Sequence, residues 1–265
     1  MKSASFPVTW KATAAYHVPG NEIVGQIIKH AEKVINIDAL LLSDAFIANI
    51  DEAMNHYEVR SIYTKELGYA LANQADRNVL QLAVLAARAA STVSGGFGGT
   101  ALTNAAYDTT ADTLAQGLYD AAQTLDEKFV PDFGERMTFL RPKHYNLLIQ
   151  SSKAIQRDWN EPSGSNGTYA TGKVLRVANL VIKKTMHLPN SVVSALPGAN
   201  NTYDGDFSNT VAAVCYKMAV GTVKLLDMAL EHDYDIRRQG TLFVAKYAMG
   251  HGVLRPECSV ELKKA

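Results

Sequence analysis

The sequence predicts a flat, extended α+β protein, on the basis of three observations. Strand-forming segments open and close the chain, and an amphipathic helical pattern of about forty residues follows the opening strands. The middle of the chain then alternates β and α segments, as in a sheet covered by helices. With 265 residues, of which 47% are apolar, the chain is long enough to bury a sizeable core.

The first fifty residues are predicted to form strands that lack a core of their own. Pro19 and Gly20 supply a turn signal, and Pro7 suits an edge strand because it cannot donate to a ladder. We therefore expect a projecting hairpin that leans on another body. Four segments are rich in strand formers: residues 2–10, 13–20, 32–38 and 45–50.

A long helix is predicted from Asp51 to about Ala90, where apolar residues recur every three or four positions. Asp51 and Glu52 in its first turn complement the helix dipole. Forty residues would make a rod of about 60 Å, which is typical of a spine along a flat molecule. The apolar stripe consists of Met54, Leu67, Leu71, Ala75, Val79, Leu82 and Ala86.

Four glycines, Gly95, Gly96, Gly98 and Gly99, interrupt the chain after this helix. A phosphate-binding loop is the rival interpretation, but the stretch lacks the Lys–Ser/Thr ending and follows a helix instead of a strand. We interpret residues 91–104 as a flexible joint that acts as a hinge.

The remaining elements follow in alternating order. A helix over residues 110–128 ends before Pro131, and residues 218–265 return to β structure with a possible short helical piece. We expect residues 194–209 to form a polar surface loop. The other expected elements are a helix at 143–152 and strands at 135–142, 174–189 (a buried pair), 210–217, 225–238, 240–250 and 258–264.

The stretch AKYAMGHGVLRPE, residues 245–257, looks like a motif but is predicted to be a strand and its end. Ala245, Tyr247 and Met249 alternate with Lys246 and Ala248, which suggests two faces. Glycines flank His251 on both sides and would bend or bulge the strand or permit a close backbone approach. The Arg–Pro pair that follows would terminate it.

No catalytic, metal-binding or cofactor-binding residues are predicted. None of the seven histidines pairs at i, i+4, and neither H-E-x-x-H nor G-x-S-x-G occurs. His232 among the acids of EHDYD is more simply a residue of a solvated strand than a cation ligand. Cys215 and Cys258 match no metal-ligand spacing, which favours free thiols in a reducing compartment.

Charge and hydropathy narrow the class of protein further. Lys plus Arg and Asp plus Glu number 26 each, and this neutral balance argues against a dedicated nucleic-acid-binding protein. The most apolar run, Val79–Ala87, is about half of the roughly 20 residues that a membrane span needs. The opening residues contain no signal-peptide core, so we expect a soluble, intracellular protein.

Two stretches carry a resemblance to a known family. IDEAMNHYEVRSIYT (50–64) and AVGTVKLLDMALE…AKYAMGHGVLRPE (219–257) resemble the major capsid proteins of T7-like short-tailed bacteriophages (podoviruses), and KSASFPV…AAYHVPG and KHAEKVINIDALLLSDAFI are similar to the same family. The resemblance covers about residues 3–90 and 210–258; from about 91 to 210 it rests on element order alone. That family is similar in fold to Hong Kong 97-type (HK-97) capsid proteins.

The resemblance implies three structural regions. Residues 1–48 would form an E-loop β-hairpin, and residues 49–90 with 219–265 a peripheral (P) domain of spine helix and strands. Residues 91–218 would form an axial (A) domain, a central sheet flanked by helices. It also implies an N-terminal arm ahead of the hairpin, which we expect to be absent here because Met1 falls almost inside the first hairpin strand.

The resemblance also implies the function. The protein would be a structural protein without catalysis or cofactor, which self-assembles into pentamers and hexamers. These would close into the icosahedral shell that encloses phage double-stranded DNA in the virion. Its partners would be other copies of itself, scaffolding protein and portal during assembly in the host bacterial cytoplasm, and packaged DNA contacted non-specifically, without a membrane.

Assembly and hinge residues are expected at four places. The hinge would be Gly95, Gly96, Gly98 and Gly99, and the hairpin turn Pro19 and Gly20. Arg255 or Glu257 is expected to contact a neighbouring subunit. The strand before them contributes Gly250, His251 and Gly252.

Three alternatives remain open at this stage. An encapsulin-like shell of the same fold would enclose protein cargo in place of DNA. An enzyme would use His251 or the acids of residues 231–235. A DNA-binding protein would at the least bind weakly, independently of sequence and in a salt-sensitive way.

Overall fold

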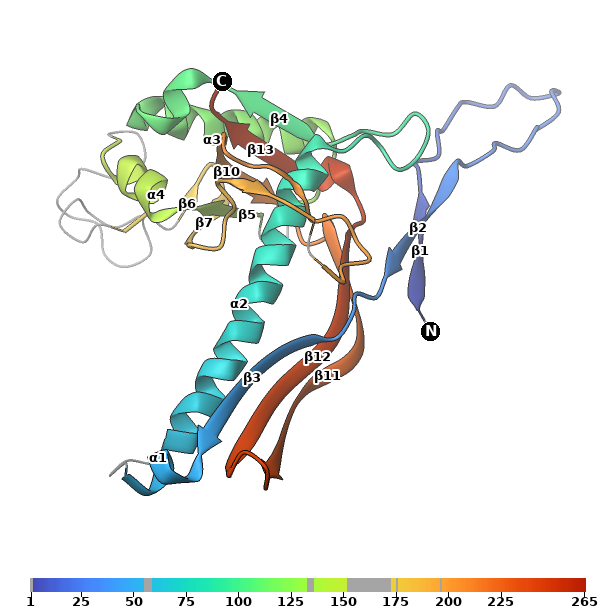
Figure 1. Cartoon of the computed structure of the whole chain (residues 1–265). Helices are drawn as coiled ribbons and strands as arrows, with labels where there is room; N and C mark the ends of the chain where they lie inside the picture. Colours follow the sequence, from blue (N-terminus) through green and yellow to red (C-terminus); the bar gives the residue numbers. More distant parts are fainter. Residues whose placement is uncertain (1, 55–58, 133–135, 152–172, 175, 196) are drawn as a thin grey trace, which may run out of the picture.

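A thirty-residue helix, α2 (Val59–Arg88), runs through most of the length of the molecule (Figure 1). The computed structural model describes residues 2–54, 59–132, 136–151, 173–174, 176–195 and 197–265. At the helical rise per residue, α2 is about 45 Å long. It joins a three-stranded sheet of long strands at one end of the molecule to a six-stranded sheet at the other.

The predicted stripe is confirmed along α2 but not beyond it. Leu67, Leu71, Leu82 and Ala86 are buried, whereas Met54 is 70% exposed. Met54 ends a separate short helix, α1 (Asn49–Met54). Residues 55–58, which include part of the NHYEVRS motif, lie outside the described residues. The described part of the expected forty-residue helix is therefore two helices.

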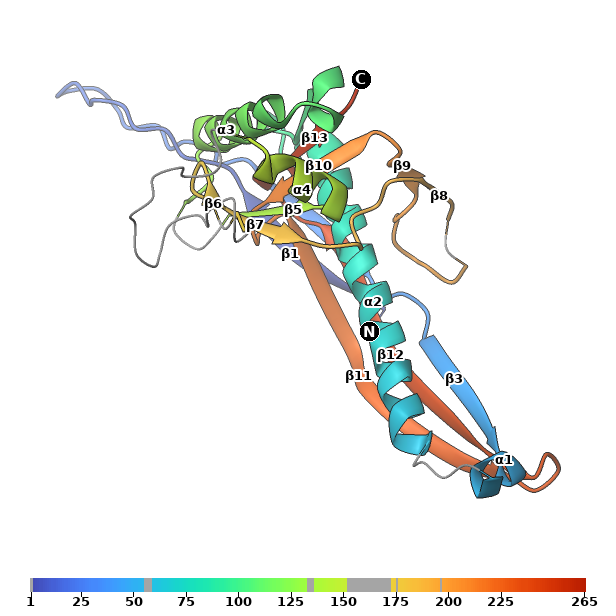
Figure 2. The same cartoon turned by 90° about the vertical axis from the view of Figure 1, so that its left-hand side faces the viewer.

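The three-stranded sheet has the order β11–β12–β3 and is antiparallel throughout. Its strands are β11 (Val220–Asp235), β12 (Gly240–Val253) and β3 (Leu41–Ala48). α2 packs on one face of this sheet and runs along its strands (Figure 2). The small core between them consists of Ile47, Leu67, Leu71, Phe243, Ala245 and Tyr247. The two long strands predicted from the sequence are confirmed, and β3 extends their sheet.

The six-stranded sheet has the order β4–β13–β10–β5–β7–β6 and contains the largest core. Helix α3 (Ala111–Glu127) packs over one face with Val260 and Leu262, and α4 (Pro142–Ile149) joins the same core. On the opposite face, Ser259 and Glu261 contact α2. The strands are β4 (Thr100–Thr103), β5 (Met137–Leu140), β6 (Arg176–Val177), β7 (Leu180–Lys184), β10 (Thr210–Cys215) and β13 (Ser259–Lys263).

The sheet pairings place two segments elsewhere than expected. β3, counted with the hairpin in the sequence, pairs with β12. β13, counted with the peripheral strands, pairs with β10 and β4 in the six-stranded sheet. The short helical piece expected in this part of the chain is present as η2 (Pro256–Cys258). Residues 91–104 were expected to be only a joint, yet they contain β4, which lies in parallel beside β13.

The projecting hairpin is formed by β1 (Ser3–Thr9) and β2 (His30–Asn36), which pair antiparallel without a break. The strand expected at residues 13–20 is wrong, because the chain there is extended but contains no strand. Two strands without a covering element are only marginally stable. The regular pairing therefore ends with β1 and β2 and does not continue into the loop between them. The turn at Pro19–Gly20 is present: Asn21 N–H donates to Val18 O at 3.2 Å, and Gly20 has a φ of +95°.

The expected polar loop at 194–209 is only partly polar. Tyr203 and Phe207 are buried, with 2% and 0% of their surface exposed. Phe207 packs in a cluster with Val84, Leu188 and Ala213 against α2. The short strand β8 (Val192–Val193) precedes the segment and pairs antiparallel with β9 (Gly205–Asp206), which lies within it. The polar composition of this stretch predicted a surface loop and gave no indication that these two aromatic side chains are buried.

Candidate functional site

The loop of the projecting hairpin exposes large apolar side chains without a core to cover them. Figure 1 shows this loop, residues 10–29, extending far from the rest of the chain. Ile27 is 95% exposed. A contiguous set of exposed apolar side chains on a soluble protein marks an interaction surface. The exposed members are Tyr16, Val18, Ile23, Val24, Ile27 and Ile28.

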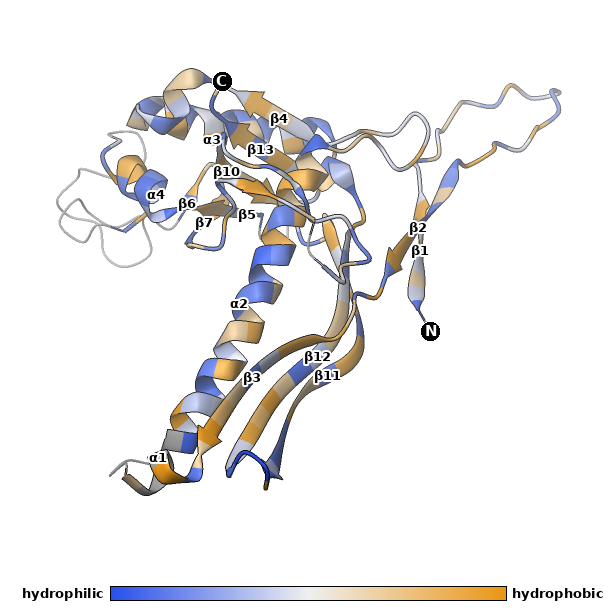
Figure 3. Ribbon diagram, viewed as in Figure 1, coloured by the Kyte–Doolittle hydropathy of each residue, from blue (hydrophilic) through white to orange (hydrophobic). Residues whose placement is uncertain are grey.

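The outer strand β11 is the second exposed apolar surface, and apolar residues also recur along β3 and β12 (Figure 3). β11 pairs with β12 on one side, and its other edge has no partner strand in the part of the chain that the structure describes. The register shifts twice, between Lys224 and Ala229. Edge strands of this length tend to pair with another chain. Its exposed apolar residues are Leu225, Leu226, Met228, Leu230 and Tyr234.

His251 lies buried in β12 and has structural contacts. Its Nδ1 is 2.8 Å from the Thr222 hydroxyl, and its backbone N–H donates to Tyr203 Oη at 3.1 Å. Burial lowers the pKa of His251, so the imidazole is held neutral. Among the described residues no carboxylate hydrogen-bonds the ring, so the Thr222–His251 pair lacks the third, orienting group of a catalytic triad.

Gly250 and Gly252 allow a close backbone approach, as one of the two interpretations expected, and the bulge expected at them is wrong. β12 keeps continuous register with β11 at both glycines. A side chain at Gly250 would collide with the carbonyl oxygen of Asn36, and one at Gly252 would lie 2.8 Å from Ile35 Cγ1. The glycines therefore allow the end of β2 to lie directly on β12.

Arg255 and Glu257 pair with each other, with 3.9 Å between Nη1 and Oε1. Glu257 is buried, with 8% of its surface exposed, whereas one third of the Arg255 side chain is exposed. A contact of either with a neighbouring subunit remains a prediction, and Arg255 is the better placed of the two. β12 ends at Val253, just before the Arg–Pro pair, as the sequence indicated.

The glycine loop after α2 packs tightly against the helix end and against the hairpin stem. Gly99 N–H donates to Ala89 O at 2.9 Å, and a Cβ at Gly99 would collide with the Ala86 carbonyl oxygen. Gly95 has a φ of +81°, which favours glycine. The ring of Phe97 meets Trp10 of the stem edge to face, 5.4 Å between centroids. A hinge at these glycines remains a prediction.

A cluster that the sequence analysis missed surrounds Asp38, two residues beyond the end of β2. Tyr203 Oη donates to Asp38 Oδ2 at 2.5 Å, and Asn201 Nδ2 donates to Asp38 Oδ1 at 2.9 Å. Burial, followed by the Asp38 hydrogen bond, raises the pKa of Tyr203, so its hydroxyl remains a donor. The cluster ties the hairpin to the 198–203 loop. The sequence does not indicate this cluster, because its two halves lie more than 160 residues apart along the chain.

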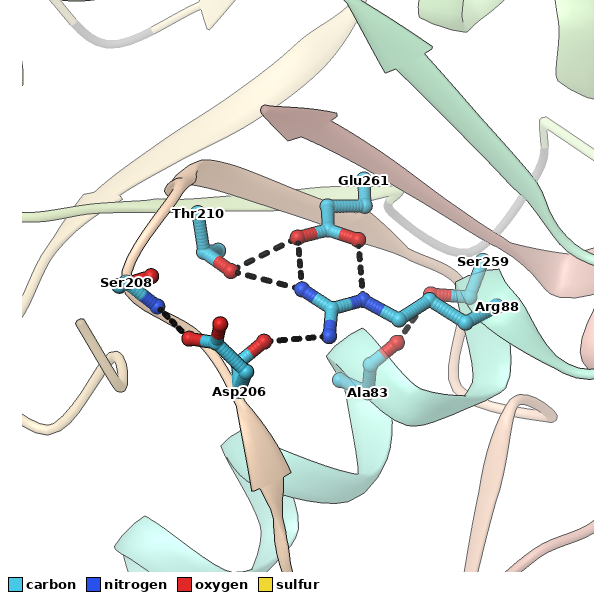
Figure 4. A network of polar contacts seen from close by, with 7 residues as sticks. All are labelled: Ala83, Arg88, Asp206, Ser208, Thr210, Ser259 and Glu261. Atoms are coloured by element: carbon cyan, nitrogen blue, oxygen red, sulfur yellow. Dashed lines mark hydrogen bonds and ion pairs between the residues drawn. The ribbon is translucent and has the colours of Figure 1, made fainter. Parts of the chain in front are cut away.

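A second cluster missed from the sequence connects α2 to the six-stranded sheet (Figure 4). Arg88 donates from Nε and Nη2 to the two carboxylate oxygens of Glu261, at 2.7 Å each. Arg88 Nη1 also donates to Asp206 O at 2.6 Å, and Thr210 donates to Glu261 Oε1 at 2.7 Å. Glu261 is completely buried. This pair fixes the angle between the spine helix and the sheet.

The acids around His232 do not assemble a site. The ring of His232 stacks on Phe243, and Glu231 accepts from Lys246 at 2.6 Å. Asp233 is exposed on β11. Among the described residues, no group of three His, Cys, Asp or Glu side chains is placed to hold a metal ion. Nor is any described helix long and apolar enough to cross a membrane.

Comparisons with known proteins agree with this geometry. A model of the Gp10A-like family, described as major capsid protein, matches residues 5–263. The major capsid proteins of Escherichia phage T7 and Enterobacteria phage T3 are each 33% identical to this chain, over 97% of it and 81% of their own length. The capsid structure of cyanophage P-SCSP1u superimposes with a TM-score of 0.89 at 40% identity, over 100% of this chain and 84% of that one. The mature capsid of bacteriophage PhiM1 gives 0.82 at 20% identity, over 100% of this chain and 82% of that one, which shows the fold alone.

Proposed function

The chain belongs to the Gp10A-like family of phage major capsid proteins and has their HK97-like fold, and from that premise we propose how its subunits join. It is a shell-forming capsid protein that associates with other copies of itself. We propose that a ring of subunits closes through a head-to-tail contact, repeated around pentamers and hexamers. Contacts of this kind close when the rotation between neighbours fits.

The observation that supports this contact is a pair of unsatisfied surfaces on one chain. The hairpin loop exposes apolar side chains, and β11 has an unpaired edge with exposed apolar residues. Both surfaces are stabilised if the loop of one subunit lies along the outer strand of the next. Burial of apolar surface contributes about 25 cal/mol per Å², and backbone pairing along the edge adds register.

We propose three regions for the subunit. The E-loop hairpin is residues 1–40, the peripheral domain contains β3, α1, α2, β11 and β12, and the axial domain contains the six-stranded sheet with α3 and α4. This division moves β3 and β13 away from the regions that the resemblance implied for them, because strands that pair within one sheet form one body. α2 runs through both domains and holds them at a fixed separation.

The remaining partners are proposed from family membership. We expect scaffolding protein and portal to act during assembly in the host bacterial cytoplasm, and packaged double-stranded DNA to touch the shell non-specifically. The formal net charge of zero supports weak contact between the shell and DNA, because a basic inner surface would bind DNA phosphates strongly and in a salt-dependent way. We propose that the protein performs no catalysis; neither His251 nor the acids at 231–235 are placed for it. Family and structural relatives do not favour an encapsulin-like shell or a DNA-binding protein.

The test of the head-to-tail contact is a pair of substitutions in the hairpin loop. Ile23→Asp with Ile27→Asp is expected to leave the subunit folded, since both side chains are exposed, and to abolish shells in electron micrographs. Asn21→Asp in the same loop is the control and should assemble as the unaltered chain does. Normal shells from the double variant would sink the proposed contact.

A further inference from the structure

The root of the projecting hairpin, residues 36–39, is bound on both sides by its own chain. We propose that Asp38, Asn200, Asn201 and Tyr203 form a clamp that sets the direction of the hairpin, and that they are positioning residues for ring assembly. The inference rests on the proposed head-to-tail contact. It adds that the direction of the hairpin is already set in the free subunit, before a neighbouring subunit binds.

The clamp is dense in hydrogen bonds. Asp38 Oδ1 accepts from the backbone N–H of Asn200 at 2.7 Å, from that of Asn201 at 3.1 Å and from Asn201 Nδ2 at 2.9 Å. Tyr203 Oη donates to the other carboxylate oxygen. Hydrogen bonds to an ionised carboxylate are roughly twice as strong as neutral ones. One side chain therefore organises the 198–203 loop around the hairpin root.

The backbone of the root is held in the same way. Asn200 Nδ2 donates to Ile37 O and Asn201 Nδ2 to Asn36 O, both at 2.6 Å. Ala39 N–H donates to Gly198 O at 3.0 Å. The side-chain amides of two consecutive asparagines thus hydrogen-bond to the main chain of the root. Rotation of the backbone at residues 36–39 would break several of these hydrogen bonds together.

β12 closes the clamp from the opposite side. Asp38 N–H donates to Met249 O at 3.2 Å, and the missing side chain of Gly250 makes room for the Asn36 carbonyl. Tyr203, the buried member of the clamp, also accepts from the His251 N–H. The root therefore has β12 beneath it and the 198–203 loop over it, which leaves no free pivot at this point.

A second contact holds the stem about one strand length away from the root. Trp10 at the end of β1 meets Phe97 edge to face, and Lys11 Nζ lies 3.2 Å from the centre of the Phe129 ring. Two separated points of attachment fix a direction, whereas one would leave a swivel. The part free to adapt to a neighbour is then the loop beyond residue 11, not the stem.

The experiment measures the direction of the hairpin in the full unassembled chain. Spin labels at Glu32→Cys on the stem strand β2 and Gln123→Cys on α3, both exposed positions, report their separation by pulsed electron resonance. Burial raises the pKa of both native thiols to about 12, which keeps them protonated and slow to label. The variants are Asp38→Asn and Tyr203→Phe. Asp44→Asn is the matched control, because the Asp44 side chain is exposed on β3 and makes no hydrogen bond or ion pair with the described residues.

We expect a narrow distance distribution for the unaltered chain and the control, and a broad one for both clamp variants. Loss of a charge-assisted hydrogen bond should raise the misdirected population roughly tenfold. Shell yield should fall with it. A merely stabilising role would lower the melting temperature without broadening the distribution, and that result would overturn the proposal.

Three further outcomes also decide the matter. A broad distribution in the unaltered chain, or clamp variants that are broad yet assemble normally, would overturn the positioning role. If the unaltered chain gives a narrow distribution but never forms shells, the proposed assembly fails while the clamp stands. The two proposals therefore fail in distinguishable ways.

Discussion

At the residue scale, the buried carboxylate of Glu261 is the most demanding group in the chain. It is completely buried, and it depends on two bonds from Arg88 and one from Thr210. The hydrogen bond to Glu261 raises the pKa of Arg88 further. Removal of one partner from such a pair leaves a charge in low dielectric, which costs far more than the intact pair contributes.

Arg88→Ala is expected to destabilise the subunit by about 3–5 kcal/mol, measured by urea unfolding of the unassembled chain. Arg77→Ala is the matched control, because Arg77 is exposed on the same helix; it should change stability by less than about 0.5 kcal/mol. Equal effects of the two changes would contradict the role assigned to the pair.

Two buried histidines make stability depend on pH. Burial lowers the pKa of both His144 and His251 below that of an unfolded histidine, about 6.5. The unfolded chain therefore takes up protons first as pH falls. This stabilisation is complete above about pH 6.5 and is lost as pH falls toward the lowered pKa values.

We expect the melting temperature of the unassembled chain to fall between pH 7.5 and 5.5. In His251→Asn the fall should be smaller, because the amide can still accept from Thr222 but does not titrate. Calorimetry across this pH range measures the melting temperatures of both proteins. An unchanged slope in the variant would show that His251 contributes nothing to it.

At the element scale, glycines decide where separate segments can touch. Gly99 lets the chain turn back against the last turn of α2, and Gly250 lets the hairpin root lie on β12. Gly68 differs, since it lies within α2 with nothing within 4 Å of an added Cβ. The same substitution therefore has opposite expected signs at these positions.

Gly99→Ala and Gly250→Ala are each expected to destabilise the subunit by about 1–3 kcal/mol, the usual cost of overpacking. Gly68→Ala should instead stabilise it by about 0.5–1 kcal/mol through helix propensity. Denaturant midpoints of the three variants check this. Destabilisation by Gly68→Ala, or none by the other two, would refute the close-contact interpretation.

The hinge predicted at Gly95–Gly99 needs a milder change than alanines throughout. Gly95→Ala meets only the flexible end of Lys29, apart from its unfavourable φ. If the hinge is real, this variant should fold but form shells that are less uniform in size, as seen by electron microscopy. Shells as uniform as those of the unaltered chain would leave the glycines with a packing role only.

At the scale of the whole molecule, surface that the subunit cannot cover determines how it associates. β11 is exposed along most of its length, and the loop of the hairpin is exposed throughout. Neither surface contributes to the hydrophobic core of its own subunit. These surfaces are stabilised when neighbouring copies cover them, so folding and assembly use different sets of apolar residues.

Met228→Ser with Leu230→Ser on β11 is expected to raise the concentration needed for assembly while unfolding changes little, because both side chains are exposed. Light scattering over a concentration series measures it. Asp233→Ser on the same strand is the control and should assemble like the unaltered chain. Equal assembly by all three proteins would remove β11 from the interface.

The sequence predicted what short-range patterns encode. The periodic stripe gave α2, and length with β-rich composition gave β11 and β12. The strand at residues 13–20 failed because strand propensity without a third strand does not hold a ribbon together. The pairing of β3 with β12, and of β13 with β10 and β4, could not be predicted, because strand partners are chosen by packing, which leaves no local signature.

The candidate site was less predictable than the fold. His251 and its glycines were noticed, but their role required knowing that residues 36–37 lie on them. Asp38 and Tyr203, or Arg88 and Glu261, are ordinary residues in the sequence and meet only after separations above 160 positions. Such pairs become visible only in three dimensions.

The place of β13 has a consequence for how the protein is made. It lies between β10 and β4, yet it follows every other described strand along the chain. A ribosome must therefore reach residue 263 before the central sheet can close and Glu261 can meet Arg88. Nascent chains and early-terminated products that stop before β13 lack this strand, so they cannot complete the six-stranded sheet.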